Sequence, residues 1–349
     1  MNKRDTLGAR TLSLIALGTV RLGLAEGPLS APLATVPSMT TPRTPPPVDE
    51  DARGIVNPAQ LQRTAQLTRY PAGEALAGLV DRFWAVTWAL PPGQEHVQAV
   101  LNHPAANLYV GVPEPGVPVP GVPDPGVPDP GVREPGARGD VPLEGALEGP
   151  HRFITRRRLA GRGWTVAAMT APGGLGAFVR VPARTLTDRT VPLDRPVLDV
   201  DGSALVAAVA APTSEEERVA ALRAGLERVV QTADAARIAA AREVAAVATV
   251  AETDRSVRRV EDLAALAGVT ERTLQRMFAE HAGLTPAWVI RRYRLLEAAE
   301  QARLHGVEVS WADLAADLGY SDQAHLVRDF RTHLGTTPAA YAARQAGAP

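Results

Sequence analysis

Cysteine is absent from the 349-residue chain, which excludes disulfides, thiolate zinc sites and a cysteine nucleophile. Lysine is nearly absent too, because Lys3 is the only one and arginine supplies all the other cationic side chains. No apolar run approaches the roughly 20 residues that a membrane-spanning helix needs, and the formal net charge is only -1. These absences favour a cytoplasmic protein without a membrane anchor, whose arginines suit phosphate and guanine.

The first 60 residues are rich in Pro, Thr and Ala and show no sustained period, which predicts a disordered leader over 1–60. The basic start and the apolar stretch after it faintly resemble a signal peptide. Arg21 interrupts that stretch, however, and no convincing Ala-x-Ala cleavage site follows. We therefore do not expect secretion.

Strand-forming residues are frequent between 61 and 212, which predicts a β-rich domain. Strands are expected within five segments: 67–90, 106–112, 151–160, 164–170 and 178–181. A Pro-Gly repeat over 111–137 carries proline at two positions in most units, so neither a helix nor a central strand can form there. We expect a solvated polyproline II insertion between two strands, the alternative being a tract that binds a partner.

Chemistry-bearing clusters are missing from this region. The glycines at 161–163 and 173–176 lack the strand-turn-helix context of a dinucleotide site. His96 and His103 are seven apart and His151 is isolated, so the spacing predicts no metal site. We therefore predict no catalytic residue, no cofactor and no metal. Four apolar residues could line a ligand pocket, although core packing is the favoured interpretation: Trp164, Met169, Leu175 and Phe178.

Residues 213–251 have a helical pattern. Ser214-Glu-Glu-Glu217 is a capping box, and Val219, Leu222 and Leu226 recur at helical spacing. A second helix, about 233–251, is almost entirely alanine and aliphatic residues. Linker, packing helix and dimer face are the roles that this composition allows.

An internal repeat follows within residues 252–346. Asp262-Leu-Ala-Ala-Leu-Ala-Gly268 matches Asp313-Leu-Ala-Ala-Asp-Leu-Gly319, and the match continues through Gly283-Leu-Thr-Pro286 and Gly335-Thr-Thr-Pro338. Glycine ends a helix readily because it adopts the left-handed conformation. Each half therefore predicts a helix, a glycine turn and a second helix, near 270–281 and 321–333.

The second helix of each half has one apolar face and one polar face. Thr270 and Ser321 are the expected N-caps. Leu274 and Phe278, like Leu326 and Phe330, fall four residues apart and are expected to face inward. The outward faces predict DNA-binding residues, because Arg pairs with guanine and Gln with adenine in the major groove. These residues are Arg272, Gln275 and Arg276 in the first half, and Gln323, Ala324, His325 and Arg328 in the second.

A long helix from Thr285-Pro286 to about Leu304 is expected to join the halves. It carries Arg291, Arg292 and Arg294, and we expect Arg291 and Arg294 to contact phosphate. Between Glu252 and Arg344 the chain holds twelve arginines and thirteen acids, so the region is not basic overall. DNA binding then requires acids such as Glu297, Glu300 and Glu308 to lie away from the nucleic acid.

Residues 240–345 resemble the AraC/XylS family of bacterial regulators. The resemblance rests on these motifs: Leu263-Ala264, Leu274-Gln-Arg276-Met-Phe278, Gly283-Leu-Thr-Pro286, Asp313-Leu-Ala, Gly319-Tyr320, Phe330 and Gly335-Thr-Thr-Pro338 with Tyr341. It implies two helix-turn-helix units on a long helix, with base-reading positions on the same exposed residues. Leu326 and Ala342 depart from the aromatic residue and the arginine that are common in the family.

Residues 69–191 are similar to the sensor domain of a subset of this family. The marks are Phe83-Trp84, Arg156–Arg158, Gly163-Trp164, Pro172-Gly173-Gly174 and Thr187-Asp188-Arg189. This similarity implies a cupin-like half-barrel. The predicted fold class is thus α+β and multidomain, with the β-rich half-barrel before an all-α double helix-turn-helix domain.

The expected function is sequence-specific DNA binding by a transcription regulator, with activation as the family default. The alternative is the same reader fused to a catalytic or protein-interaction module. Catalysis is not expected, because alkyl-transfer repair proteins with a similar reader need a cysteine, and a cupin enzyme needs clustered metal ligands. Double-stranded DNA is the expected partner; RNA polymerase, a small-molecule effector and a second copy of the chain are further candidates.

Overall fold

The computed structural model describes residues 52–112, 144–195, 197–199 and 201–346. Most of the predicted leader, and the Pro-Gly repeat from residue 113 onward, lie outside the described residues. The folded chain nevertheless begins inside the predicted leader: Ala52 is buried and helix α1 spans Pro58–Thr64. The boundary at residue 60 is therefore too late.

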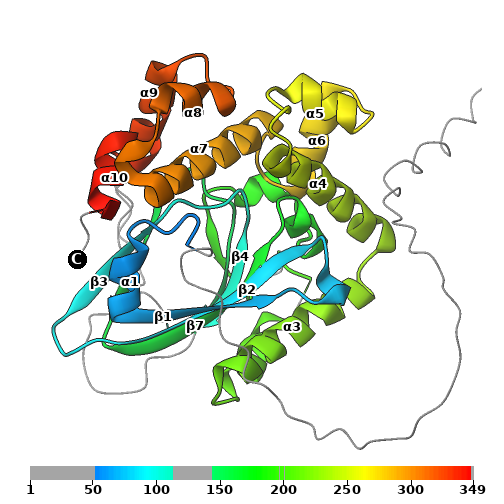
Figure 1. Ribbon diagram of the computed structural model, residues 1–349. Coiled ribbons are helices and arrows are strands. Elements are labelled where there is room, and N and C mark those ends of the chain that lie inside the picture. Colours follow the sequence, from blue (N-terminus) through cyan, green and yellow to red (C-terminus); the bar gives the residue numbers. More distant parts are fainter. Residues whose placement is uncertain (1–51, 113–143, 196, 200, 347–349) are drawn as a thin grey trace, which may run out of the picture. The chain divides into compact units, whose positions relative to one another are not determined.

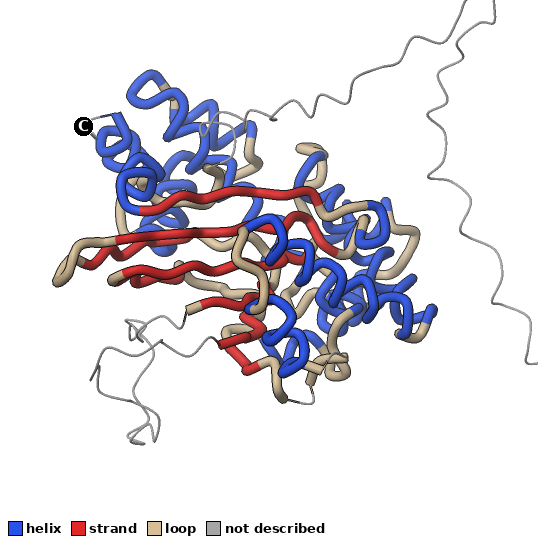
Figure 2. The backbone as a smooth tube through the Cα atoms, turned by 90° about the horizontal axis from the view of Figure 1, so that it is seen from below, coloured by secondary structure: helices blue, strands red, loops and turns tan. Residues whose placement is uncertain are grey.

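Antiparallel strands form a six-stranded sheet in the order β1-β2-β7-β4-β5-β8, and β3 and β6 pair separately as a two-stranded ribbon. Figure 2 shows the strands in red. Their bounds are β1 (Ala65–Pro71), β2 (Val80–Ala89), β3 (Glu95–Val100), β4 (Asn107–Gly111), β5 (Glu144–Glu148), β6 (Thr155–Ala160), β7 (Arg162–Thr170) and β8 (Thr190–Pro192). Gly111 of β4 pairs with Glu144 of β5, so the undescribed segment between them connects neighbouring strands.

Strand β2 shows why the sheet has two different faces. Phe83 and Ala85 are buried in the main core of the β-rich domain, whereas Trp84 and Val86 are only partly buried on the opposite face. Alternation of side chains along a strand produces this division. On the second face, Gly163 of β7 is opposite Trp88, and a Cβ there would lie 2.3 Å from the indole ring.

One predicted element of the β-rich region is wrong, and one helix was not predicted. Residues 178–181 form no strand but a single bridge between Val179 and Leu198, after the short 3-10 helix η3 (Gly174–Ala177). Helix α2 (Gly202–Ala210) was not expected, because its sequence is almost entirely apolar and shows no helical alternation of polar residues. The remaining 3-10 helices are η2 (Glu74–Leu76), η4 (Ala183–Leu186) and η5 (Gly306–Glu308).

Helices α3 (Glu215–Thr232) and α4 (Ala235–Thr253) follow the sheet. Ser214 caps α3 as predicted, since its Oγ accepts a hydrogen bond from the Glu217 N–H at 3.3 Å. Helix α4 contributes Ile238 and Ala241 to the core of the β-rich domain. Its next turns contribute Val244 and Ala248 to the core of the helical domain. Helix α4 is thus a packing helix shared by two cores, and a dimer face stays a prediction.

The C-terminal region is entirely helical, as predicted. Figure 1 shows α7 between the pair α5 and α6 (yellow) and the pair α8 and α9 (orange). The bounds are α5 (Val260–Leu266), α6 (Glu271–His281), α7 (Pro286–His305), α8 (Trp311–Asp317), α9 (Gln323–Leu334) and α10 (Pro338–Ala346). A β-rich region followed by an all-helical region confirms the expected α+β organisation.

Candidate nucleic-acid interface

The two helix pairs turn with the same backbone geometry. After α5, the N–H of Gly268 donates to the Ala265 carbonyl and the N–H of Val269 to the Ala264 carbonyl, both at 3.1 Å. After α8, the N–H groups of Gly319 and Tyr320 donate to Ala316 and Ala315 at 3.0 and 2.8 Å. Both glycines have positive φ, 65° and 70°. This is the Schellman motif, and it explains why the repeat preserves glycine at both positions.

The N-caps of the second helices are only partly as predicted. Thr270 caps α6, accepting from the Thr273 N–H at 3.2 Å. Ser321 does not cap α9; Asp322 does, accepting from the His325 N–H at 2.6 Å. Gly268 and Gly319 are 51 residues apart, but Gly283 and Gly335 are 52 apart, so the second half of the repeat has one residue more after its glycine turn. This extra residue moves the cap to Asp322, and aspartate caps a helix as well as serine does. The Ser321 Oγ lies instead 3.1 Å from His325 Nδ1.

The predicted inward faces are buried. Leu274 and Phe278 of α6 and Leu326 and Phe330 of α9 are fully inaccessible to solvent and share one core with α7. Phe330 also contacts Tyr341 of α10, edge to face, at 5.6 Å between ring centroids. Burial of these residues fixes the rotation of each second helix and so decides which side chains face outward.

The predicted base-reading residues lie on the outward faces. Arg272, Gln275 and Arg276 of α6 are exposed, and so are Gln323, Ala324 and Arg328 of α9. His325 is half-buried, with its ring edge-to-face against Tyr320 at 5.1 Å. The structure therefore brings together each set of three or four residues on its own helix. Their contact with bases stays a prediction.

The arginines of α7 all have partners within the protein. The Arg291 Nε donates to Asp329 Oδ1 at 2.9 Å, although about half of the Arg291 side chain is exposed. Arg294 is half-buried and donates to the carbonyls of Arg258 and Gly319. Arg292 is buried, stacks over Trp288 at 4.5 Å and donates to the Arg152 carbonyl at 2.6 Å. Arg292 is thus a contact with the β-rich domain and not a phosphate ligand.

Asp329 of α9 is a buried acid that the sequence reasoning missed. It accepts hydrogen bonds from Arg291, from the Tyr320 hydroxyl at 2.9 Å and from His333, whose Nδ1 lies 3.1 Å away. Burial acts to raise the pKa of this carboxyl, but the hydrogen bonds from His333, Arg291 and Tyr320 outweigh it and hold the pKa well below its usual range. The signal in the sequence is an acid directly before Phe330, on the inward side of an otherwise amphipathic helix.

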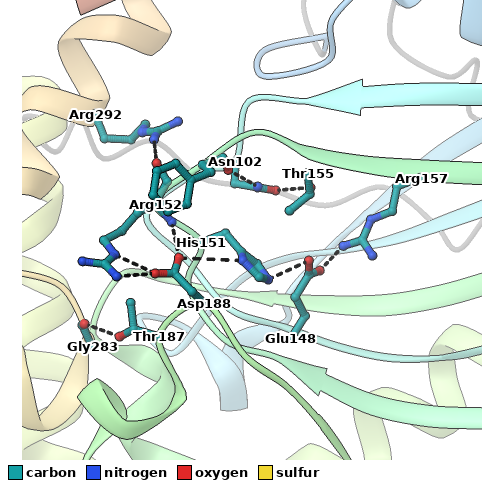
Figure 3. A network of polar contacts seen from close by, with 11 residues as sticks. Asn102, Glu148, His151, Arg152, Thr155, Arg157, Thr187, Asp188, Gly283 and Arg292 are labelled. Atoms are coloured by element: carbon teal, nitrogen blue, oxygen red, sulfur yellow. Dashed lines mark hydrogen bonds and ion pairs between the residues drawn. The ribbon is translucent and has the colours of Figure 1, made fainter. Parts of the chain in front are cut away.

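The helical domain is docked on the β-rich domain by a polar network (Figure 3). The Thr187 hydroxyl donates to the Gly283 carbonyl at 2.5 Å, and Arg292 reaches the loop that holds Arg152. Arg152 in turn pairs with Asp188 at 2.6 Å. Gly283 has room for no side chain, since a Cβ would lie 2.8 Å from the Ala183 carbonyl oxygen. The exposed faces of α6 and α9 take no part in these contacts.

A cavity of about 160 Å³ lies on the second face of the sheet, between the sheet, the β3-β6 ribbon and the segment before α1. Apolar side chains make most of its wall, among them Leu67, Trp84, Val86, Trp88, Leu159 and Met169. Of the four residues suggested for a pocket, only Met169 lines it; Leu175 and Phe178 are buried core residues and Trp164 packs against that core. Trp84 and Trp88 lie in the expected strand segment 67–90, and Trp84 is also a mark of the similarity to the sensor domain, but neither was predicted to line a pocket.

Within the part of the chain that the structure describes, no helix combines the length and apolar character needed to cross a membrane. In the same residues, no three His, Cys, Asp or Glu side chains gather in a way that could hold a metal ion.

Comparison with known families gives two matches. Residues 263–344 match a family described as "Helix-turn-helix domain". Residues 68–192 match a family described as "Domain of unknown function (DUF6597)". The first match covers both helix-turn-helix units, and the second covers the sheet.

The curated relatives align with the helical domain. The chain is 36% identical over 83 residues to the probable transcription factor PqrA of Proteus vulgaris, covering 24% of this chain and 66% of that protein. It is 30% identical over 82 residues to the HTH-type transcriptional activator AarP of Providencia stuartii, covering 24% of this chain and 59% of that protein. The chain thus spans less than two thirds of the length of these relatives.

Among solved structures, ToxT from Vibrio cholerae aligns over 80% of this chain and 98% of that one, at 10% identity and a TM-score of 0.34. At this score the alignment supports no argument about the site.

Proposed function

We propose that this chain is a regulator of the AraC/XylS type and that it regulates transcription by binding specific DNA sequences, since residues 263–344 match a helix-turn-helix domain family and 83 residues are 36% identical to a probable transcription factor. One observation supports this most strongly: two helix-turn-helix units with the same turn geometry each expose an Arg- and Gln-bearing helix face. Such faces are chemically suited to base edges in the major groove. Activation is the favoured direction of regulation.

In this proposal α6 and α9 enter two successive major-groove segments. Arg272, Gln275 and Arg276 read the first half of the site. Gln323, Ala324, His325 and Arg328 read the second. Helix α7 has 20 residues, which at about 1.5 Å each gives about 30 Å, close to the roughly 34 Å between successive turns of the groove.

Arg291 and Arg294 remain our proposed phosphate contacts on α7. Asp329 holds only part of the Arg291 guanidinium, and the exposed half of that side chain is left to approach a phosphate. The acids of α7 are paired within the protein: Glu297 with Arg255 and Arg53, and Glu300 with Arg303. Internal pairing of these acids reduces their repulsion of DNA, which supports binding by a domain without net positive charge.

We further propose that the protein acts in the cytoplasm and does so without catalysis. The cavity in the β-rich domain supports a small-molecule effector. RNA polymerase and a second copy of the chain are further proposed partners. The alternative hypothesis is that the Pro-Gly repeat is a protein-interaction tract. It predicts that deletion of residues 112–136 abolishes regulation while DNA binding persists.

Footprinting of the purified full-length protein on the DNA upstream of its own gene tests the proposal. We expect protection of about two helical turns per monomer and a moderate decrease of affinity with salt, because few phosphates are contacted. Arg228→Ala, an exposed position of α3, should leave the footprint unchanged. Protection of no sequence over any other, or an affinity independent of salt, would contradict direct sequence recognition.

A further inference from the structure

Arg53 connects the cavity of the β-rich domain to α4 and α7, which share one core with the proposed base-reading helices α6 and α9. It lines the cavity, and its Nη1 lies 2.9 Å from Glu252 Oε1 at the end of α4. Its Nη2 lies 3.6 Å from Glu297 Oε2 in α7. The Nε–H is buried and donates no hydrogen bond within the described part of the chain. One donor of this guanidinium thus has no partner among the described residues.

The charged side chains that line the cavity are all basic. Four arginines line it, Arg53, Arg69, Arg82 and Arg157, and among the described residues no Asp or Glu does. The acids that pair with Arg82 and Arg157, Asp81 and Glu148, lie outside the lining. An anion entering the cavity therefore meets guanidinium groups in the wall, and the carboxylates with which it would compete for Arg53, Arg82 and Arg157 lie outside the lining.

His103 also lines the cavity. Burial lowers the pKa of its imidazole, and the charges of Arg82 and Arg53 lower it further against the opposing charge of Asp81, to about 4. The ring is therefore neutral at pH 7 and contributes no charge of its own. Its Nε2 lies 3.4 Å from the Arg53 carbonyl oxygen, which ties it to the same segment.

The neutral polar groups of the wall already bond to the protein. The indole N–H of Trp84 donates to Asn107 at 3.0 Å, and that of Trp88 donates to the Ala160 carbonyl at 3.1 Å. Asn102 donates to the Phe153 carbonyl and accepts from the Thr155 hydroxyl. A neutral polyol such as a sugar would find few unused partners here and would lose its hydration. An apolar molecule with a single charged group fits better.

The size of the cavity limits that apolar part. A volume of about 160 Å³ is close to that of an engineered protein cavity of about 150 Å³ that takes up benzene. One aromatic ring, or a short aliphatic chain, fills such a space. Both tryptophans of β2, Trp84 and Trp88, line this space.

We propose that this cavity binds a small hydrophobic carboxylate, with the apolar part between Trp84 and Trp88 and the carboxylate on Arg53. A charge-assisted hydrogen bond from the guanidinium is the strong contact in such a complex. The bound carboxylate also competes with Glu252 and Glu297 for Arg53, which loosens the contact of this segment with α4 and α7. That last step, regulation of DNA binding, rests on the proposed function; ligand binding does not.

Titration calorimetry of the full-length protein with four probes tests the binding. Benzoate and hexanoate represent the aromatic and aliphatic carboxylates; benzyl alcohol and benzylamine are the neutral and cationic counterparts of benzoate. We expect benzoate or hexanoate to bind at least about tenfold more tightly than benzyl alcohol, and benzylamine not to bind. Whichever of benzoate and hexanoate binds more tightly shows whether the cavity prefers an aromatic or an aliphatic ligand. Equal affinity for benzoate, hexanoate and benzyl alcohol, or no binding of either anion, overturns the proposal.

Variants locate the carboxylate. Arg53→Gln should weaken binding of the preferred anion at least about tenfold and leave benzyl alcohol unchanged, which also shows that the cavity is intact. Arg53→Lys, which keeps the charge, should retain most of the affinity. Arg228→Gln removes an exposed arginine of α3 and should change neither ligand. Undiminished anion binding by Arg53→Gln overturns the assignment of Arg53.

A DNA-binding assay with and without the saturating anion separates the two proposals. Anion binding together with an unchanged DNA affinity refutes the coupling through Arg53 and leaves the cavity assignment standing. Anion binding by a protein that binds no specific DNA refutes the proposed function and not the ligand. Specific DNA binding without any anion binding refutes the ligand alone.

Discussion

The two reading helices present different sets of residues to a DNA site. In α6 the exposed set includes two arginines and a glutamine, whereas in α9 it includes one arginine, a glutamine and the short Ala324. Arg276→Ala should therefore relax specificity in one half of the operator, and Arg328→Ala in the other, each at a cost of about 1–3 kcal/mol. Binding to operators with base changes in one half at a time measures this.

The exposed Arg228 of α3 serves again as the matched control, because its substitution removes the same charge from a helix without a reading role. If Arg276→Ala and Arg328→Ala weaken binding to all sequences equally, the two side chains contact phosphates and not bases.

The buried carboxylate of Asp329 orients helix α9 against α7 through its contact with Arg291. Asp329→Asn keeps the shape but removes the charge that Arg291, His333 and Tyr320 surround. We expect a loss of about 2–4 kcal/mol in the free energy of unfolding, measured by urea denaturation. Binding to the second half-site should weaken more than binding to the first. Asp317→Asn, at an exposed position of α8, is the control, and equal losses in the two variants would contradict a special role of Asp329.

The imidazole of His103 gives the stability a dependence on pH. Its pKa is lowered to about 4 in the folded protein, first by burial and then by Arg82 and Arg53. The unfolded chain, with a pKa near 6.5, therefore binds more protons between these values, and stability falls as the pH decreases from about 6.5 to 4. The contribution is about 1–2 kcal/mol after allowance for partial exposure of the ring.

Urea denaturation of His103→Asn across this pH range should show a flatter profile than the unaltered protein. His305→Asn, at an exposed position at the end of α7, should keep the original slope. An unchanged slope in the His103 variant would mean that other groups cause the acid sensitivity.

At the scale of elements, the two glycine turns are equivalent in backbone geometry but differ in their surroundings. A Cβ at Gly268 would meet open space, whereas one at Gly319 would lie 3.2 Å from the Arg258 side chain. Gly268→Ala should cost about 1 kcal/mol because of its positive φ, and Gly319→Ala should cost more. Thermal unfolding measures both. Gly268→Asn should be milder than Gly268→Ala, since asparagine tolerates this conformation better; the reverse order would refute the explanation by φ.

Elements with a repeated pattern were predictable from the sequence. The helices of the two units follow from their glycines, caps and four-residue spacing, and only the cap of α9 was misplaced, by one residue. Helix α2 and the short strands β3, β5 and β8 were not predicted, because no regular apolar alternation marks them. Their formation depends on partners distant in sequence, such as the pairing of β3 with β6.

For the candidate sites too, only the residues whose positions follow from a local sequence pattern could be predicted. The outward residues of α6 and α9 follow from helical periodicity, which is local. Arg53 could not be predicted to line a cavity, because it lies in the segment that was predicted to be a disordered leader and reaches α4 and α7 only through the tertiary fold. Asp329 likewise becomes meaningful only when Arg291 and Tyr320 are seen beside it.

At the scale of the whole molecule, the two cores are joined through α4. Ile238 and Ala241 belong to one core and Val244 and Ala248 to the other. We therefore expect the β-rich and helical domains to unfold together in one calorimetric transition, with equal calorimetric and van't Hoff enthalpies. Ala241→Gly should lower the midpoint of that transition without splitting it. Two separate transitions in the unaltered protein would show that α4 does not couple the cores.

The pairing of Gly111 with Glu144 determines how freely the chain between them can change. Strand β4 ends and β5 begins at paired positions, so the two ends of the intervening segment are held close together whatever its length. The entropy of closing a flexible loop varies with the logarithm of its length, and a doubling costs only about 0.6 kcal/mol. Insertions and deletions should therefore accumulate at this place during evolution with little loss of stability.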